Sequence, residues 1–273
     1  MYDVMTVLTK VIYPAPGSLV INLLSVGSCL SLSNAGWMET KGIHMQYSKL
    51  GDDHNKENNN NKKVKKVPSK VGMSVIYAPA FVAGLSSFLI YPIDFRFTLL
   101  CSAVTLHFFK RLFEVLFVHK YSGSMEVGAM VTISLSYFVN AAGLIHNQHL
   151  MHSLSQPSID LKGVGIPIFL IGIAGNYYHH YLLSKLRTTN SDNNKGYKIP
   201  RGGLFGLVIC PHYLFEIVGF VGISCISQTV YAVLYTVGTT FYLMGRSYAT
   251  RKWYESKFED FPVDVKALFP YVF

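Results

Sequence analysis

The sequence predicts an all-α, polytopic membrane protein built from a bundle of about seven transmembrane helices. Half of the 273 residues are hydrophobic and only 14% are charged, whereas about 25% of the residues in soluble domains are charged. Apolar segments close to the roughly 20 residues that a helix needs to cross a bilayer recur along the chain. Basic residues gather in alternate connections between these segments, as is typical of cytosolic loops.

Seven apolar segments define the expected helices in chain order. The first is shortened by a cluster of Ser, Gly and Asn residues, and the third carries Lys110, Arg111 and Glu114, so these two depart most from a uniformly apolar span. The expected helices cover residues 18–37, 72–92, 97–118, 125–146, 161–183, 204–223 and 225–245.

The positions of the basic residues predict the orientation of the bundle. With seven crossings, all but three of the 24 Lys and Arg residues fall on the same side of the membrane as the C-terminus, and the exceptions are Lys10, Arg96 and Lys162. Because cytosolic loops carry the excess of Lys and Arg, we expect a lumenal N-terminus and a cytosolic C-terminus. The net charge of +9 is then concentrated on one face, where it attracts anionic lipid.

The domain organisation follows from one break in composition. Residues 51–70 (GDDHNKENNNNKKVKKVPSK) are of low complexity and lack apolar periodicity, so they cannot bury a core. We expect an N-terminal segment with the first helix at 1–46, a disordered cytosolic linker at 47–70, and a membrane domain at 71–273. No cleavable signal peptide is expected at the start of the chain. The four cysteines lack CxxC spacing and are expected to be free, buried thiols.

Polar side chains interrupt the later apolar segments. Asn176, His179 and His180 lie within 161–183, and His212, Tyr213 and Glu216 follow in the next segment. Ionisable groups at membrane depth cost roughly 2.5 kcal/mol or more when charged, so they usually line an internal site. The pattern therefore indicates a polar, catalytic pocket inside the bundle. Adjacent histidines point about 100° apart on a helix, so we expect no metal site.

Four motif blocks gather near the cytosolic ends of the last three expected helices. They are GNYYHHYLLSKLR at 175–187, YKIPRGGLF at 197–205, CPHYLFE at 210–216 and RSYATRKWYESKFEDFP at 246–262. Their guanidinium groups suit phosphates, their amide and carboxylate groups suit a ribose or a nicotinamide, and their phenols can donate protons. The sequence lacks a GxGxxG turn and a P-loop, so a dinucleotide would bind without a Rossmann fold.

These blocks, together with the terminal stretch KALFPYVF, resemble the C-terminal domain of the steroid 5-alpha-reductases over residues 174–273. A further block, HFFKRLFEVLFVHKYSG at 107–123, resembles the trans-2-enoyl-CoA reductases of very-long-chain fatty acid elongation. The asparagine-rich linker and the overall motif pattern resemble plant members. The resemblance marks 71–273 as a membrane reductase domain.

The resemblance implies an NADPH-dependent oxidoreductase of lipid and steroid metabolism in the endoplasmic reticulum membrane. Such an enzyme reduces a carbon–carbon double bond that is conjugated to a carbonyl group. The resemblance to the enoyl-CoA reductases in particular implies a catalytic pair, Glu114 and Tyr213. The cofactor-binding residues that it implies are Asn176, Arg187, Arg201, His212, Glu216, Arg246 and Tyr254.

The sequence departs from the steroid reductases at the groups that hold the 3-keto oxygen. Phe108 stands where those enzymes carry a Tyr, and no carboxylate occurs in 71–92. Arg251 replaces a His before KWY, and His212 replaces an Asn. An alternative interpretation of Glu114 is structural, because it can form an ion pair with Lys110, four residues earlier on the same helix.

Three functions stay open from the sequence. The favoured one is 5-alpha reduction of a 3-oxo-delta-4 steroid. The alternative is a trans-2-enoyl-CoA reductase, which is disfavoured because we expect no extended region before the first helix. The third is a membrane scaffold that has lost activity. The expected partners are a lipophilic small molecule and membrane lipid; nucleic acid is not expected, because no basic stripe with interleaved aromatics lies in a soluble domain.

Overall fold

A computed structural model describes residues 9–45, 65–92, 94–186 and 197–273. Long helices dominate these residues, which confirms the all-α fold. The elements are α2 (Leu19–Thr40), β1 (Lys66–Pro68), α4 (Ser69–Ile90), α5 (Phe95–Phe113), a π-helical turn η1 (Glu114–Val118), β2 (Ser124–Glu126), α6 (Val127–Leu150), α7 (Lys162–Leu186), a 3-10 turn η2 (Gly203–Gly206), α8 (Pro211–Ser227) and α9 (Val230–Lys257).

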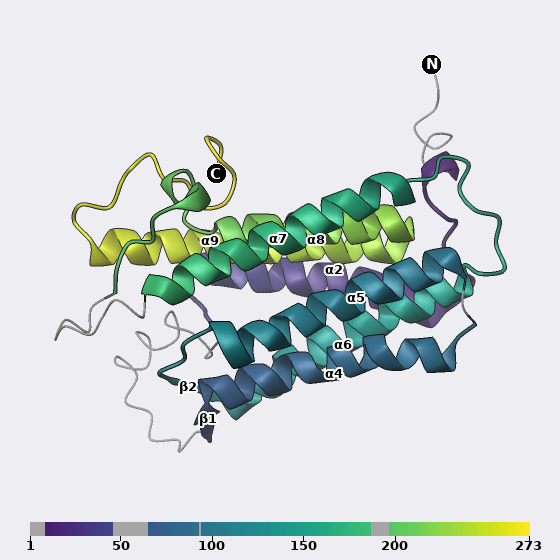
Figure 1. The fold of residues 1–273 in the computed structure, drawn as a ribbon, viewed down its shortest axis with the longest axis horizontal. Coiled ribbons are helices and arrows are strands. Elements are labelled where there is room, and N and C mark those ends of the chain that lie inside the picture. Colours follow the sequence, from purple (N-terminus) through teal and green to yellow (C-terminus); the bar gives the residue numbers. More distant parts are fainter. Residues whose placement is uncertain (1–8, 46–64, 93, 187–196) are drawn as a thin grey trace.

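Seven long helices run side by side through the described residues (Figure 1). Three of them, α2, α4 and α6, are long and apolar enough to cross a membrane, and α8 is apolar but shorter, with 17 residues. Successive helices alternate in direction. Helices α2, α5, α7 and α9 finish at one end, which we call the C-terminal end, and the opposite end is the N-terminal end.

The prediction for the sixth helix is wrong at its start. We expected it to begin at residue 204, but α8 begins at Pro211 and is preceded by the η2 turn. Gly202 and Gly203 have φ angles of 86° and 52°, which favour glycine and hold the chain in a tight turn. Pro211 occupies the first turn of α8, where its missing N–H costs no helical hydrogen bond.

The seventh helix also differs from its prediction. Its expected range was 225–245, whereas α9 runs from Val230 to Lys257. Gln228 adopts a left-handed conformation with φ 53° and ends α8. At the other end the helix continues through the aromatic segment, because Trp253 and Tyr254 are buried there in a cluster with Phe261. The C-terminal end of α9 is therefore part of the packed structure.

Close helix pairs hold the bundle together, namely α7 against α8 and α2 along α9. A Cβ atom at Gly172 of α7 would overlap the backbone of Gly219 on α8, and one at Gly245 of α9 would overlap the backbone of Gly36 on α2. Small residues allow helices to approach closely where apolar burial supplies little driving force. Helix α2 thus belongs to the same bundle as the C-terminal helices.

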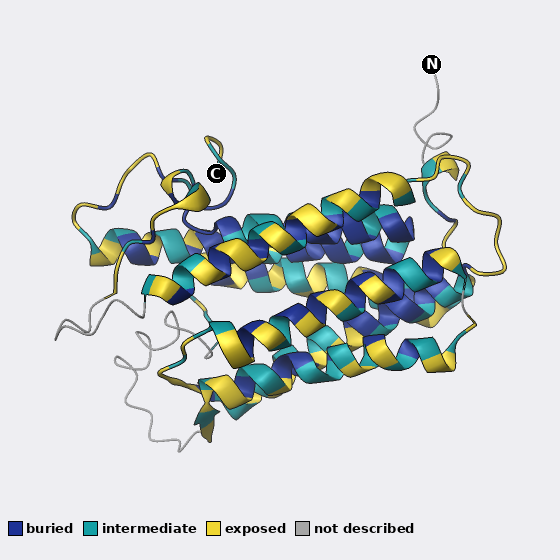
Figure 2. Ribbon diagram, in the orientation of Figure 1, coloured by how far each residue is buried: buried dark blue, intermediate teal, exposed yellow. Residues whose placement is uncertain are grey.

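The exposed surface of the helices is apolar. Leu89 of α4 is 90% exposed, and Leu19 of α2 and Phe117 of η1 are 70% and 74% exposed. Figure 2 shows buried residues along α5, α8 and α9, whereas α7 carries many exposed residues. Exposed apolar side chains on the outer faces of long helices are typical of a bundle that lipid surrounds.

Short connections close the C-terminal end. Strands β1 and β2 pair antiparallel, with Val67 opposite Met125, and so join the start of α4 to the start of α6. The last residues of the chain return to the η2 region, where the Ile209 N–H donates to the Lys266 carbonyl oxygen at 2.8 Å. Arg251, which we noted as a departure in the motif, donates from Nε to the Val265 carbonyl oxygen at 2.8 Å.

A buried arginine closes the N-terminal end. Arg96, which is 2% exposed, donates to the Ile226 carbonyl oxygen at 2.7 Å, to Gln228 Oε1 at 2.8 Å and to Asp160 Oδ1 at 3.0 Å. Gln228 in turn donates to the carbonyl oxygens of Val11 and Ile159. One guanidinium group therefore joins α5, the α8–α9 turn and two other connections.

Two aspartates lie near this arginine. Asp94 accepts hydrogen bonds from the Phe97 N–H at 2.8 Å and from His152 Nδ1 at 2.8 Å. Burial raises the pKa of the Asp94 carboxyl, but these hydrogen bonds, the charge of His152 and the Arg96 N–H together outweigh burial and leave the pKa below its usual value. Asp160 also has a lowered pKa, because hydrogen bonds from Lys162 outweigh the desolvation of its carboxyl.

Candidate functional site

Glu114 is the centre of a buried charge network at the C-terminal end. Its side chain is fully buried at the first position of η1. Lys110 Nζ lies 3.0 Å from one carboxylate oxygen, and Arg111 Nη1 and His180 Nδ1 lie 2.9 and 3.0 Å from the other. A buried carboxylate requires such compensation. The expected ion pair with Lys110 is thus present, and Arg111 and His180 extend it.

Asn176 joins this network to α8. Its Oδ1 accepts a hydrogen bond from Lys110 Nζ. Its Nδ2 donates to the His212 carbonyl oxygen at 2.6 Å and lies 3.4 Å from Glu216 Oε2. The buried Asn176 amide therefore links His212 and Glu216, which the sequence also placed in the polar pocket, to Lys110 of the charge network. Because an asparagine amide has both donors and an acceptor, it suits this central position.

An aromatic row continues from the same network. The His180 and His212 ring centroids are 5.2 Å apart, and the rings of His212 and Tyr213 are 4.2 Å apart. Tyr213 is half-buried. The structure thus brings Glu114 and Tyr213 into one continuous cluster through His180 and His212, although they come from different helices.

His179 points away from this cluster, as expected of neighbouring helical residues. Its Nδ1 lies 2.7 Å from the Gly175 carbonyl oxygen, and its Nε2 accepts from the Leu204 N–H at 3.1 Å. The carbonyl partner can only accept, so the hydrogen-bond pattern assigns the proton to Nδ1. His179 therefore fixes the YKIPRGGLF loop to α7, and Arg201 is exposed on that loop.

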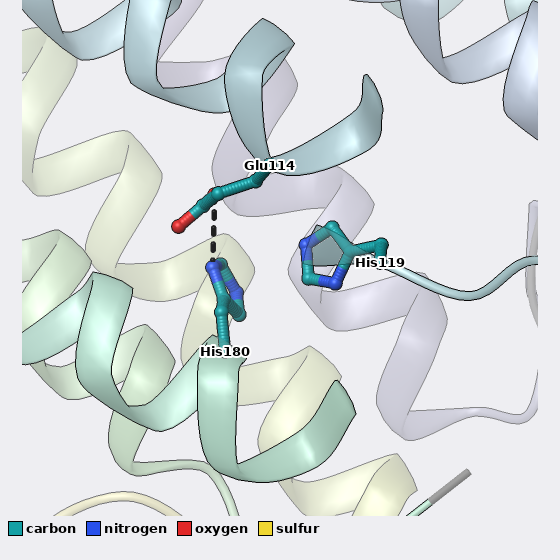
Figure 3. Close-up of side chains that lie close together, drawn as sticks. All are labelled: Glu114, His119 and His180. Atoms are coloured by element: carbon teal, nitrogen blue, oxygen red, sulfur yellow. Dashed lines mark ion pairs between the residues drawn. The ribbon is translucent and has the colours of Figure 1, made fainter. Parts of the chain in front are cut away.

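Figure 3 shows that Glu114, His119 and His180 lie close together. One possible ligand atom from each lies within 4.8 Å of the other two. The Glu114 carboxylate already contacts the positive charges of Lys110 and Arg111 at about 3 Å, and these charges oppose a divalent cation at the same place. The absence of a metal site stays a prediction.

The other predicted cofactor residues lie along α9 and the adjacent loop. Arg246, 3% exposed, donates from Nη1 to both oxygens of Glu39 at 2.8 Å. Tyr254 is buried and stacks on Phe258, with ring centroids 5.8 Å apart. Arg187 lies outside the described residues. Sequence reasoning missed Glu39, although a single acidic residue at the end of an otherwise uncharged apolar helix is a signal for it.

Two tyrosines beside Phe108 were also missed. Tyr77 of α4 accepts a hydrogen bond from Arg111 Nη2 at 2.5 Å, and the guanidinium carbon lies 4.8 Å from the centroid of its ring. The Tyr137 ring of α6 lies 5.4 Å from Tyr77 and 5.6 Å from Phe108. Phenol groups from α4 and α6 thus surround the position at which the sequence lacks a Tyr.

A groove of about 540 Å³ lies between α2 and α6 and opens to the outside of the bundle, where Leu23 and Leu135 of its wall are 62% and 57% exposed. Its walls are mostly apolar, with a few hydroxyl groups and one amide, that of Asn140. This size and lining suit a lipophilic ligand. The lining residues are Val20, Leu23, Leu24, Gly27, Ser28, Ser31, Leu32, Thr132, Leu135, Ser136, Val139 and Asn140.

A family model described as 3-oxo-5-alpha-steroid 4-dehydrogenase matches residues 125–273. The very-long-chain enoyl-CoA reductase of Dictyostelium discoideum is 30% identical over 182 residues, which are 62% of this chain and 55% of that protein. The human 3-oxo-5-alpha-steroid 4-dehydrogenase 2 is 26% identical over 180 residues, 64% of this chain and 68% of the relative.

Plant relatives match over a shorter region. The steroid 5-alpha-reductase DET2 of Gossypium hirsutum is 38% identical over 110 residues, 40% of this chain and 42% of that protein. The chain thus spans about half the length of several curated relatives that it matches. The resemblances to steroid 5-alpha-reductases and to enoyl-CoA reductases are both confirmed, and the relatives are oxidoreductases.

Proposed function

Because the chain belongs to the 3-oxo-5-alpha-steroid 4-dehydrogenase family, we propose that it reduces a carbon–carbon double bond conjugated to a carbonyl group in a lipophilic substrate, with NADPH as the reductant. The substrate that we favour is a 3-oxo-delta-4 steroid, which gives the 5-alpha product. The observation that carries the reduction itself, whichever substrate is bound, is the Glu114 network beside His212 and Tyr213, since it gathers proton-donating groups inside an apolar bundle. The steroid is favoured because the steroid family model matches residues 125–273, which include the YKIPRGGLF block and the C-terminal tail.

The donors around α8 fit a nicotinamide cofactor. His212 Nδ1 is buried and has no hydrogen-bond partner among the described residues, and Asn176 and Glu216 lie beside the same turn. An amide group of a nicotinamide can satisfy such an atom. Asn176, His212 and Glu216 would hold the nicotinamide end, and Arg187, Arg201, Arg246 and Tyr254 would hold the phosphate and adenosine groups. NADPH, when bound, supplies the hydride.

The protein's own residues stabilise the charge that develops on the carbonyl oxygen. Hydride addition at the beta carbon places negative charge on this oxygen, and a positioned donor lowers the barrier. Arg111 donates to the Tyr77 hydroxyl at 2.5 Å, so the tyrosine can donate its own proton toward a substrate oxygen. In this proposal Tyr77 acts at the place where Phe108 offers no hydroxyl.

Tyr213 is the proposed proton donor. Glu114 is proposed to balance the positive charges of Lys110 and Arg111 in the same network. The aromatic row from Tyr213 through His212 to His180 ends on the Glu114 carboxylate. A general acid requires a nearby group that restores its proton, and contributes about 10²- to 10⁴-fold to the rate. The row places the titratable side chains of His212, His180 and Glu114 one after another beside Tyr213.

The second candidate is trans-2-enoyl-CoA reduction. The specific observation in its favour is that Lys110, Arg111 and Glu114, the charged residues of the network, all come from the block at 107–123, which resembles the enoyl-CoA reductases. Both candidates place the chain in the endoplasmic reticulum membrane as a multi-pass protein, with a lumenal N-terminus and a cytosolic C-terminus. The domain that we propose to carry the reaction covers 71–273, with α2 packed against it.

The test measures NADPH oxidation by membranes that contain the protein, with progesterone and with trans-2-hexadecenoyl-CoA in separate assays. We expect conversion of the steroid to the 5-alpha product, identified by mass spectrometry, and its loss in Tyr213→Phe. The matched control is Tyr178→Phe, which alters an exposed tyrosine on α7. Turnover of the CoA ester alone would establish the second candidate. Turnover of neither, together with no binding of NADPH, would establish an inactive scaffold.

A further inference from the structure

We propose that Lys70 is a positioning residue for the reaction, because its hydrogen bond to η1 holds the turn on which Glu114 stands. Lys70 lies in the first turn of α4, at the last position of the segment that we expected to be a linker. The inference rests on the proposed function, since the part of Glu114 in the reaction is taken from there. The hold of Lys70 on η1 rests on the geometry alone.

The turn η1 leaves the α-helical register at Glu114. The His119 N–H donates to the Glu114 carbonyl oxygen at 2.7 Å, five residues back, whereas an α-helical bond spans four residues. Single π-helical turns are rare and are frequent at functional sites. The register also places the His119 ring 4.9 Å from that of His180, which is a partner of Glu114. Successive helical residues point about 100° apart, so a return to the α-helical register would turn His119 away.

The end of η1 needs hydrogen-bond donors from elsewhere. The chain is extended at His119, with ψ 139°, so the residues after it cannot continue the helical pattern of hydrogen bonds. Lys70 supplies a donor from another helix, because its Nζ donates to the Leu116 carbonyl oxygen at 2.9 Å. Its positive charge lies at the C-terminal end of α5 and η1, where the aligned peptide dipoles favour a cation. The side chain of Lys70 therefore stabilises this turn.

A second contact from the same turn of α4 holds the other end of the connection. The Ser69 N–H donates to the Gly123 carbonyl oxygen at 2.9 Å, beside the pairing of β1 with β2. Two neighbouring residues of α4 thus hold the connection after η1, Ser69 through its backbone and Lys70 through its side chain. The Lys70 side chain can be changed without removing the backbone contacts of the strand pair.

The position of Glu114 matters because its carboxylate contacts three partners at once. Lys110, Arg111 and His180 all lie 2.9 to 3.0 Å from its oxygens. Arg111 in turn donates to Tyr77, the proposed donor to the substrate oxygen. A displacement of about 1 Å in a positioned group can lower a rate about 100-fold. A looser η1 turn therefore reaches the reacting atoms through Glu114 and Arg111.

The first measurement is hydrogen exchange of the backbone amides at 114–119, in the full chain in lipid nanodiscs without NADPH. Lys70→Met keeps the length of the side chain but removes the donor and the charge, and Lys70→Arg keeps both. Lys66→Met is the matched control, since Lys66 is an exposed lysine of the adjacent strand β1. We expect exchange to be about fivefold faster in Lys70→Met, the effect of one net hydrogen bond. Exchange in the other two variants should match the wild type.

The second measurement is turnover with NADPH and with whichever of progesterone and the CoA ester the wild-type chain reduces. We expect kcat to fall about fivefold in Lys70→Met with KM unchanged, because an interaction that acts only in the transition state lowers kcat and kcat/KM equally. Lys70→Arg should restore kcat. Lys66→Met should retain it.

Wild-type exchange in Lys70→Met overturns the hold of Lys70 on η1. Faster exchange with an unchanged kcat overturns the positioning role and makes Lys70 a structural contact only. The same losses in Lys66→Met assign the effect to the charge of this end and also overturn the inference. If Lys70→Met does not fold, Lys70→Gln, which has a shorter and neutral side chain, repeats both measurements.

Failure of the proposed function is distinguishable from failure of this inference. If the wild-type chain reduces neither substrate, the proposed function fails and the positioning role fails with it. The exchange measurement needs neither cofactor nor substrate, so it decides separately whether Lys70 holds the turn. A chain that turns over substrate equally well with and without the Lys70 amine leaves the proposed reaction standing.

Discussion

The two ends of the bundle each bury a charge, and they satisfy it in different ways. At the N-terminal end, Arg96 donates to a backbone carbonyl oxygen, to Gln228, whose own partners include two further carbonyl oxygens, and to one carboxylate, that of Asp160. At the C-terminal end, the partners of the Glu114 carboxylate among the described residues are side chains, those of Lys110, Arg111 and His180. Backbone partners hold the chain in place, whereas titratable side chains can exchange protons and shift with a ligand. The comparison separates a structural network from a reactive one.

Arg96→Leu tests the structural end, and we expect it to have the largest effect. It leaves Asp160 and the connecting carbonyl oxygens without their common donor, and breaking a buried charged network typically costs about 3–5 kcal/mol. Thermal unfolding in detergent should show a large fall in the midpoint, with activity per folded molecule unchanged. Lys185→Gln, an exposed change on α7, is the control. A stable Arg96→Leu with lost activity would reverse the comparison.

Glu114→Gln tests the reactive end. The substitution keeps the size of the side chain and removes its charge, so we expect the rate to fall about 10²-fold, at the lower limit for acid–base groups. Circular dichroism should show a retained helical fold. The contrary result would be wild-type turnover by Glu114→Gln, which would make the carboxylate a purely structural partner of Lys110 and Arg111.

Tyr77→Phe sharpens the comparison within the reactive end. It removes one hydroxyl beside Arg111, and we expect about a tenfold fall in kcat with little change in KM, since loss of one donor acts mainly on the transition state. The matched control is Tyr91→Phe. Tyr91 directly follows α4, the helix that carries Tyr77, but lies at the N-terminal end of the bundle. An unchanged kcat would remove Tyr77 from the mechanism.

Asp94 gives the smallest expected effect. The pKa of its carboxyl is lower in the folded state than in the unfolded chain, so its contribution to stability is present above its unfolded value and is lost as the pH falls through the folded value. Unfolding midpoints of the wild type and Asp94→Asn should therefore differ at pH 7 and converge below about pH 4. A difference that grows on acidification would contradict this account.

The sequence predicted helices where apolar residues are continuous, because length and hydropathy alone decide whether a segment can span a bilayer. It failed at residues 204–210, where two glycines with positive φ and Pro211 delay the helix. An apolar run does not distinguish a buried turn from a helix. The end of α9 was missed because burial of Trp253 and Tyr254 depends on the returning tail.

The candidate site was predicted in part. Asn176, His212 and Tyr213 were found as polar groups in apolar segments, and the structure places them around one helix junction. Tyr77 was missed because one tyrosine in an apolar helix has no distinctive spacing. Glu39 was missed for a related reason, since its partner Arg246 lies 207 residues away in the chain. Contacts between distant segments become visible only once the helices are packed.

The hydrogen bonds around Gln228 bear on how the protein is assembled in the cell. The Tyr13 N–H donates to the Gln228 carbonyl oxygen at 2.9 Å, so the first described segment contacts the turn before the last helix. Synthesis proceeds from the N-terminus. The hydrogen bond of Tyr13 therefore cannot form until Gln228 has been synthesised. The guanidinium group of Arg96 enters the bilayer boundary long before its carbonyl acceptors exist. Closure of this end therefore cannot precede the synthesis of residue 228, and a chain that stops before α8 leaves the Arg96 guanidinium without its Ile226 and Gln228 acceptors.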